Sequence, residues 1–285
     1  MKIVLVCVGN FQEYILINIQ QLILCHNKEI YVITDAVYFN MFIKYLNDIT
    51  LIDASSLNDS FNYNPGENVD SSFRNGFWSL TSKRLFLLFS FMNKYNIEDV
   101  VHLENDVLIY YNCDILSDKM DPNKICVPLD CYIRSIASII YIPNPNVLGL
   151  FLRHYDMNRN DMQNLSVIQR KIPALFDNFP ICMPLPHFTT EQKFVCRQFD
   201  KFNMIFDAAA MGQMVGGIDP RNQGGNGNTI GFINETSVIK YNNYQFLWYE
   251  CDGIRKPYLK IDEENIVPIF NLHIHSKNLI DFVQF

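Results

Sequence analysis

The sequence predicts an α/β fold with a mixed, mostly parallel central sheet flanked by helices. In the first half of the chain, short apolar segments alternate with segments of helical periodicity, the pattern of a parallel sheet wrapped by helices. The 285 residues are 49% hydrophobic, which is enough for one large core. No internal repeat and no clean linker divides the chain, so we expect residues 1–285 to form a single domain.

The first half is predicted to contain strands and helices in alternation. The predicted strands are short and rich in Val, Ile and Leu, whereas the predicted helices carry apolar residues three and four positions apart. The polar segment 55–76, rich in Asn, Ser, Asp and Gly, is typical of a surface loop. Strands are expected at 2–8, 29–34, 49–53 and 98–103, and helices at 11–25, 37–46 and 79–95.

The second half has a less regular pattern. Residues 211–232 hold seven of the twelve glycines, which predicts a loop whose backbone turns tightly or approaches a ligand closely. Strands are expected at 125–129, 137–143, 237–241, 244–250, 258–261 and within 266–279, and helices at 146–157 and 162–172.

Composition narrows the classes of function. The net charge of -7 and pI near 5.3 argue against nucleic acid and anionic membranes as partners, because both need a basic surface. The eight cysteines form no CxxC pair and several lie in apolar runs, so we expect buried thiols. The N-terminus is expected to be a first strand and the protein to be cytoplasmic, with no transmembrane segment, since no run of 18 apolar residues exists.

The stretch HLENDVLIY, residues 102–110, interrupts a strand pattern with Glu104, Asn105 and Asp106. Two carboxylates at i and i+2 of an extended chain point to the same face, where they repel each other unless a cation lies between them. The carboxyl edge of a parallel sheet is also where ligands of open α/β folds bind. The motif therefore indicates a Mg²⁺ or Mn²⁺ site, with two solvated loop carboxylates as the alternative.

The stretch NLHIHSKNL, residues 271–279, places His273, His275 and Lys277 on one face of an extended chain. An imidazole ligand and an ammonium group could therefore converge on a metal diphosphate. The alternative is a terminal strand with a solvated polar side.

Two further segments carry candidate binding residues. The helix predicted from Ser79 contains Arg84, which could hold diphosphate oxygens in a bidentate grip, or could be one of several solvated basic residues behind a Ser N-cap. In FDAAAMGQMVGG, Asp207 and Gln213 stand among small residues that would let them approach a sugar, to position it or to take a proton. The alternative for Asp207 is the cap of a helix.

Taken in this order, these motifs resemble the nucleotide-sugar-dependent glycosyltransferases of the GT-A fold. The resemblance covers most of the chain: the βαβ opening, the helix SLTSKRLFLL, the strand ending in HLENDVLIY where the family has its DxD motif, and the late HIHSK. It implies a GT-A-like domain with a nucleotide-binding half, 1–111, and an acceptor-binding half, 112–285. Glu104 stands where the family has the first Asp, which is a departure from the usual pattern.

The resemblance also implies roles for the metal ligands and the diphosphate contacts. Asp106 would bind Mn²⁺ or Mg²⁺, with Glu104 near the ribose or the metal. His275, or else His273, would be the third ligand. The residues implied in donor binding also include Asn105 of the motif, and Arg84 and Lys277 at the diphosphate.

The remaining implied residues contact the base and the sugars. The turn of Val8, Gly9 and Asn10, together with Asp35, would lie near the base, while Asp207 and Gln213 would contact the donor sugar or the acceptor. The implied activity is metal-dependent transfer of a hexosyl group from a nucleotide sugar, UDP being the family's commonest carrier, to a hydroxyl of a glycan, protein or lipid.

Two other classes of protein are alternatives to a glycosyltransferase. A non-catalytic module that binds nucleotide sugars or glycans would keep the fold without turnover. A dinucleotide oxidoreductase is disfavoured, because VCVGNFQEY follows the first strand where such enzymes carry GxGxxG.

Overall fold

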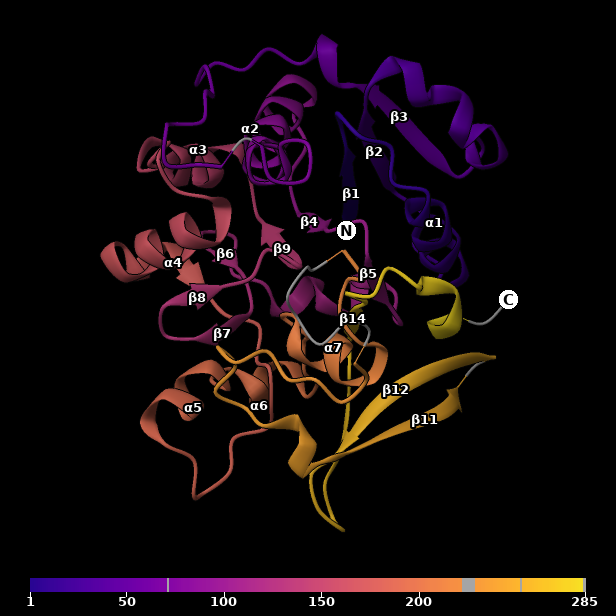
Figure 1. Cartoon of the computed structure of the whole chain (residues 1–285), viewed down its shortest axis with the longest axis vertical. Helices are drawn as coiled ribbons and strands as arrows, with labels where there is room; N and C mark the ends of the chain where they lie inside the picture. The colour runs from indigo at the N-terminus through magenta and orange to yellow at the C-terminus, as the bar shows by residue number, and fades with distance from the viewer. Residues whose placement is uncertain (71, 222–228, 252, 284–285) are drawn as a thin grey trace.

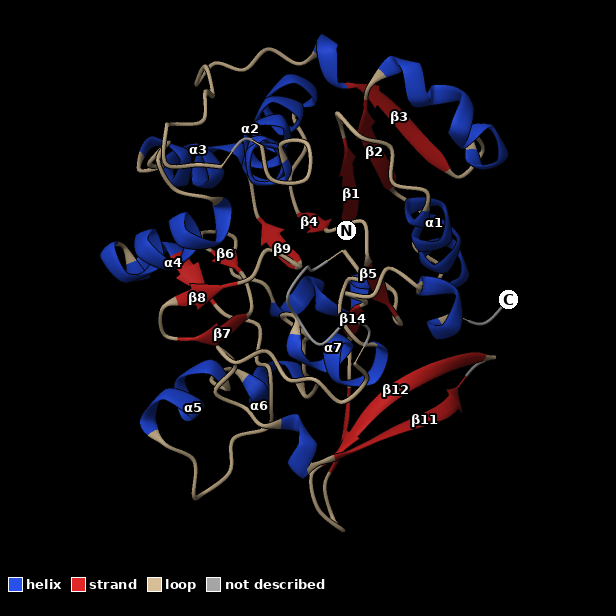
Figure 2. Cartoon of the chain, in the orientation of Figure 1, coloured by secondary structure: helices blue, strands red, loops and turns tan. Residues whose placement is uncertain are grey.

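A seven-stranded sheet lies at the centre of the computed structural model, which describes every residue except 71, 222–228, 252 and 284–285 (Figures 1 and 2). The strand order is β10-β6-β9-β4-β1-β2-β3. Strand β9 runs antiparallel to both of its neighbours, and the other pairs are parallel. The predicted fold class, a mixed and mostly parallel sheet flanked by helices, is confirmed. The strands are β1 (Lys2–Cys7), β2 (Ile30–Thr34), β3 (Ile49–Asp53), β4 (Val100–Leu103), β6 (Ile125–Cys126), β9 (Ile139–Ile142) and β10 (Phe176–Asp177).

The alternating side chains of β1 show how the sheet is covered on both faces. Ile3 and Leu5 pack in one apolar cluster with helix α1 (Tyr14–Leu24). Val4 and Val6 point to the opposite face, because successive side chains of a strand alternate. That face is covered by α2 (Phe77–Tyr95), α3 (Pro145–Arg153) and α4 (Asp161–Lys171). The near-continuous apolar run of β1 follows from this double coverage.

A small antiparallel pair of strands, separate from the seven-stranded sheet, brings two distant segments of the chain together. Strand β14 (Asn271–His273) pairs with β5 (Val107–Ile109), with His273 opposite Val107. The amide of Ile274 continues the pairing by donating to the carbonyl of Asp106 at 2.9 Å. This pairing places HIHSK beside HLENDVLIY, although the two segments are more than 160 positions apart in the sequence.

The remaining elements are short or peripheral. An antiparallel sheet of β11 (Gln245–Cys251), β12 (Ile254–Lys260) and β13 (Ile266–Pro268) lies at the end of the molecule opposite α2 and α3 (Figure 1). The others are β7 (Leu129–Cys131), β8 (Arg134–Ser135), α5 (Thr190–Val195), α6 (Phe199–Phe202), α7 (Ala210–Gly216), η1 (Ala36–Tyr45), η2 (Ala54–Ser56), η3 (Cys113–Lys119), η4 (Pro173–Leu175), η5 (Tyr241–Asn243) and η6 (Leu279–Phe282).

Three expected elements differ from the structure. Residues 36–45 form a 3₁₀ helix instead of an α-helix, and several of the apolar side chains that suggested an amphipathic face are exposed, Val37 at 77% among them. Residues 211–216 belong to helix α7, so the segment 211–232 is not a loop from its start, while 222–228 lie outside the described residues. Residues 237–241 form no strand.

The cysteines are free thiols, and seven of the eight are buried, as predicted. Within the described part of the chain, no helix is both long and apolar enough to cross a membrane.

Candidate functional site

A cavity of about 750 Å³ opens at the carboxyl ends of β1 and β4. Residues of both halves of the chain line it. Ten of the predicted site residues are among them: Val8, Asn10, Arg84, Glu104, Asn105, Asp106, Gln213, His273, His275 and Lys277. Three others, Gly9, Asp35 and Asp207, are not among the described residues that line it.

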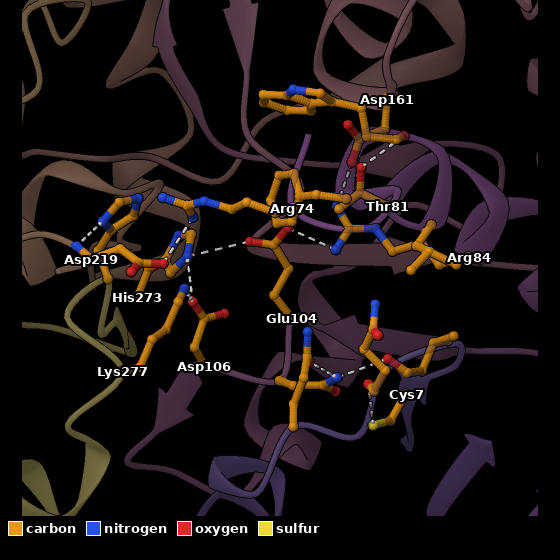
Figure 3. Close-up of a pocket in the computed structure, with 18 of the residues that line it drawn as sticks. Cys7, Arg74, Thr81, Arg84, Glu104, Asp106, Asp161, Asp219, His273 and Lys277 are labelled. Carbon is orange, nitrogen blue, oxygen red and sulfur yellow. Dashed lines mark hydrogen bonds and ion pairs between the residues drawn. The ribbon is translucent and has the colours of Figure 1, made fainter. Parts of the chain in front are cut away.

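Glu104, Asp106 and His273 form the acidic centre of this cavity (Figure 3). One donor atom from each side chain lies within 4.8 Å of the others. His273 Nε2 lies 3.2 Å from Asp106 Oδ2 and 3.4 Å from Glu104 Oε2. The expected meeting of the two distant motifs therefore occurs, and His273 is the histidine that makes it.

A tight turn holds the two carboxylates together. After β4 the amide of Val107 donates to the carbonyl of Glu104 at 3.0 Å, so the chain turns here instead of staying extended. Between them, the side-chain Nδ2 of Asn105 donates to the carbonyl of Val6 at 2.8 Å and to Gln12 Oε1 at 2.6 Å. Asn105 therefore ties the turn to the end of β1.

The position of the protons on His273 is set by its second ring nitrogen. Nδ1 lies 3.0 Å from the carbonyl oxygen of Ala208, and because a carbonyl only accepts hydrogen bonds, Nδ1 carries a proton. Nε2 then presents either a lone pair or a second proton to the carboxylates. Burial opposes a charged ring, yet Asp106 and Glu104 raise the pKa of His273 to about 9. The site thus demands a positive charge at Nε2, from a proton or from a cation.

His275 is arranged differently. Its Nδ1 accepts the backbone N–H of Asp219 at 3.0 Å, so the neutral ring carries its proton on Nε2. Burial, together with the charges of His273 and Lys277, lowers the pKa of His275 to about 4. A ring in this state can donate to an anion but offers no second lone pair to a metal. The geometry favours His273 over His275 as the imidazole ligand.

Lys277 contacts the acidic centre directly, because its ammonium group bonds to Asp106 Oδ2 (Figure 3). Burial would raise the pKa of Asp106, but Lys277 and His273 hold it well below its ordinary value. Asp106 is therefore ionised and able to bind a cation.

Arg84 has different partners from those expected. One end of its guanidinium pairs with Glu104 Oε1 at 2.7 Å, and the other pairs with Asp161 of α4. The side chain is buried, so these two carboxylates supply the charge that compensates its removal from water. A bidentate grip on a diphosphate would require Arg84 to leave them. In this structure Arg84 orients Glu104.

Asp207 occupies the helix-start position that was the alternative prediction. It is fully buried, and its carboxylate accepts the backbone amides of Met211, Gly212 and His273 at 2.7 to 2.9 Å. Burial raises its pKa to about 6, and the three amides oppose that shift. Asp207 thus anchors α7 to β14, and it is not among the described residues that line the cavity.

Gly212 explains how α7 comes so close to His273. A side chain at this position would overlap the carbonyl oxygen of His273, so only glycine allows the contact. The next residue, Gln213, is 6% exposed and lines the cavity. Its Oε1 has no hydrogen-bond partner among the described residues, so its amide remains a candidate for contact with a substrate.

The first turn after β1 is fixed mainly by its own contacts. Gly9 has φ +76° and donates its amide to Asp35 Oδ2 at 2.6 Å, while Tyr38 donates its hydroxyl to the Gly9 carbonyl. Asp35 therefore supports the turn, and Val8 and Asn10 are the residues that face the cavity.

A second charged cluster, which the sequence patterns did not predict, consists of Arg74 and Arg221, both paired with Asp219. All three line the cavity. Arg74 lies in the segment taken as a surface loop, and 145 positions separate it from Asp219. Only the turn signal Asp-Pro-Arg at 219–221 marks this region in the sequence.

No protein-family model and no curated protein sequence matches the chain. Among solved structures, mouse xyloside xylosyltransferase 1 is similar at 9% identity and a TM-score of 0.45, over 63% of this chain and 84% of that one. The glycosyltransferase GlyE of Streptococcus pneumoniae TIGR4 is similar at 15% identity and a TM-score of 0.40, over 62% of this chain. A cytidylyltransferase from Leptospira borgpetersenii serovar Hardjo-bovis follows at 9% identity and a TM-score of 0.39, over 63% of this chain and 75% of that one. This chain spans 45% of GlyE.

Proposed function

We propose that this protein is a metal-dependent glycosyltransferase that moves a hexosyl group from a nucleotide sugar, with UDP as the carrier, to a hydroxyl of a glycan, protein or lipid. The observation that carries the proposal is the cluster of Glu104, Asp106 and His273 inside a large cavity edged by basic side chains. We also propose that the protein works in the cytoplasm.

The cluster has the donor chemistry of a Mn²⁺ or Mg²⁺ site. It combines two carboxylates with one imidazole whose other nitrogen is held by the Ala208 carbonyl, the arrangement that orients a metal-binding histidine. Three protein ligands would leave coordination positions open for phosphate oxygens. A divalent cation bound there would stabilise the negative charge on a departing nucleoside diphosphate.

The charges of the side chains that line the cavity suit the joint binding of a divalent cation and a nucleoside diphosphate sugar. The described lining residues include five acidic side chains (Glu13, Glu104, Asp106, Asp161 and Asp219) and five basic ones (Arg74, Arg84, Arg134, Arg221 and Lys277), so their formal charges cancel when the histidines are neutral, the state in which His273 could bind a cation. A divalent cation and a nucleoside diphosphate sugar with two negative charges would leave that balance unchanged. Either ligand alone would disturb it, which favours binding of the two together.

The chain's own residues divide the remaining tasks. Lys277, now paired with Asp106, would exchange that partner for a phosphate oxygen. Gln213 would position a sugar hydroxyl with its amide, which cannot take a proton. Val8 and Asn10 would face the base.

UDP is expected to stabilise the protein far more with Mg²⁺ or Mn²⁺ present than in a chelator. A ligand that binds only the folded state at 100 times its Kd adds about 2.7 kcal/mol, which is a readily measured thermal shift. The measurement is a thermal melt with UDP and metal, UDP and EDTA, and each alone. Equal stabilisation by UDP in metal and in EDTA would remove the metal from the proposal.

A non-catalytic nucleotide-sugar-binding module is the second candidate, favoured by the burial of Asp207 away from the cavity. Incubation of UDP-glucose and UDP-galactose with the protein and Mn²⁺ separates the two. A transferase without its acceptor releases UDP slowly by hydrolysis, whereas a binding module is stabilised by the donor and releases none.

A further inference from the structure

Asp219 pairs with two arginines, Arg74 and Arg221, that lie far apart in the sequence. Figure 3 shows Arg74 beside Asp219. Arg74 Nη1 lies 2.9 Å from Asp219 Oδ2, and Arg221 Nη2 lies 2.9 Å from the same oxygen. Arg221 also bonds to Oδ1 through Nε at 3.1 Å and through its backbone amide at 2.8 Å. The carboxylate side chain is 1% exposed, so two guanidinium groups enclose it.

The same residue organises a third donor. The backbone amide of Asp219 donates to His275 Nδ1, which leaves the Nε2 proton of His275 available to an acceptor. The rings of His275 and His273 lie 5.9 Å apart between centroids. The Asp219 cluster therefore lies beside the acidic centre, on the same wall of the cavity.

Two arginines converging on one carboxylate form an anion-binding arrangement that this carboxylate already fills, and the Nε2–H of the adjacent His275 is a further donor for a larger anion. Two arginines fit a phosphoryl group at least as well as a carboxylate, since a phosphate offers more oxygens in a bidentate geometry. Burial opposes the charge of Asp219, yet Arg221 and Arg74 lower its pKa to about 2, which shows how strongly they favour an anion.

We propose that Arg74, Arg221 and His275 form a phosphoryl-binding subsite next to the metal cluster, and that Asp219 occupies it until a diphosphate displaces the carboxylate. This inference rests on the proposed function only for the identity of the natural ligand, a nucleoside diphosphate sugar. The subsite itself replaces the diphosphate grip that the sequence assigned to Arg84.

The aromatic side chains nearby provide a direct reporter. The guanidinium of Arg74 lies 5.0 Å from the centre of the Phe73 ring, and Phe73 stacks on Trp78 at 19°. Trp78 lines the cavity, and the only other tryptophan, Trp248, is not among its described lining residues. In a Trp248→Phe background, the fluorescence of Trp78 should therefore change when Arg74 moves from Asp219 to a bound anion.

The experiment is a titration of this protein with inorganic pyrophosphate at fixed Mg²⁺, read by Trp78 fluorescence. Asp219→Asn removes the competing charge, so pyrophosphate should bind about tenfold more tightly. Arg221→Gln should bind it about tenfold or more weakly, because a charge-assisted contact is lost. Arg134→Gln is the matched control, since it removes one positive charge from the same cavity outside the Asp219 cluster.

The proposal is overturned by equal or weaker pyrophosphate binding in Asp219→Asn, or by equal losses in Arg221→Gln and Arg134→Gln. If Asp219→Asn does not fold, Arg221→Gln against Arg134→Gln decides alone, because the Arg221 side chain is 62% exposed and its loss leaves the fold intact. Pyrophosphate carries neither nucleoside nor sugar. A protein that binds it in this pattern but releases no UDP from any nucleotide sugar would keep the subsite and lose the proposed activity.

Discussion

Replacement of Asp106 by asparagine is expected to lower metal-dependent turnover of the nucleotide sugar by on the order of 10²- to 10³-fold. Asp106 Oδ2 lies at the centre of the site, in contact with both His273 Nε2 and the Lys277 ammonium. A neutral amide keeps the shape but loses the charge that would bind a divalent cation. The measurement is UDP release from the donor with Mn²⁺, together with Mn²⁺ affinity, and Asp118→Asn on the exposed surface of η3 is the matched control.

The effects of replacing Asp106 and His273 on Mn²⁺ affinity should not be additive. If both side chains hold one ion, the double replacement Asp106→Asn with His273→Ala should cost less Mn²⁺ affinity than the two single losses together, because the second change acts on an emptied site. His275→Ala should cost less Mn²⁺ affinity than His273→Ala, since its Nδ1 is engaged by Asp219. Additive losses at Asp106 and His273 would show that they serve separate sites.

Replacement of Asp207 by asparagine is expected to lower the free energy of unfolding by about 2–4 kcal/mol. Its carboxylate is fully buried and accepts three backbone amides. An asparagine can satisfy some of them through its oxygen, but its NH₂ group would face the others as donor against donor. Mn²⁺ affinity should also fall, since Asp207 anchors the backbone of His273.

Chemical denaturation measures this loss, and Asp70→Asn is the matched control. Asp70 is exposed and accepts the amides of Ser72 and Phe73, so its replacement should cost less than about 1 kcal/mol. Normal stability with strongly reduced turnover in Asp207→Asn would instead restore Asp207 to the catalytic role predicted from the sequence.

The sequence predicted the fold and the pair of acidic side chains in the cavity because both depend on strong local patterns. Alternating apolar segments specify strands and helices, and Glu104 with Asp106 interrupts a strand at the sheet edge. The late HIHSK could be linked to that edge only through resemblance, since the β5–β14 pairing joins distant segments. Which of the two histidines can offer a lone pair to a metal depends on the partner of each Nδ1, Ala208 for His273 and Asp219 for His275. No sequence pattern encodes these partners.

The contacts of Arg84 and Asp207 could not be predicted from the sequence, for one shared reason. Whether Arg84 is available to a ligand depends on the carboxylates next to it, and Asp161 lies 77 positions away in the chain. The residues next to Asp207 in the sequence give no sign that its carboxylate accepts the amide of His273, 66 positions later. The exposed apolar side chains of residues 36–45 show the same limit for secondary structure, because periodicity does not reveal whether a face finds a partner.

The most direct test of this account is anomalous diffraction from crystals of the protein grown with UDP and Mn²⁺. One strong manganese peak is expected in coordination contact with Glu104, Asp106 and His273, with phosphate oxygens of UDP on the same ion. UDP bound in the cavity with no manganese at these three side chains, or with the ion on His275 instead of His273, would contradict it.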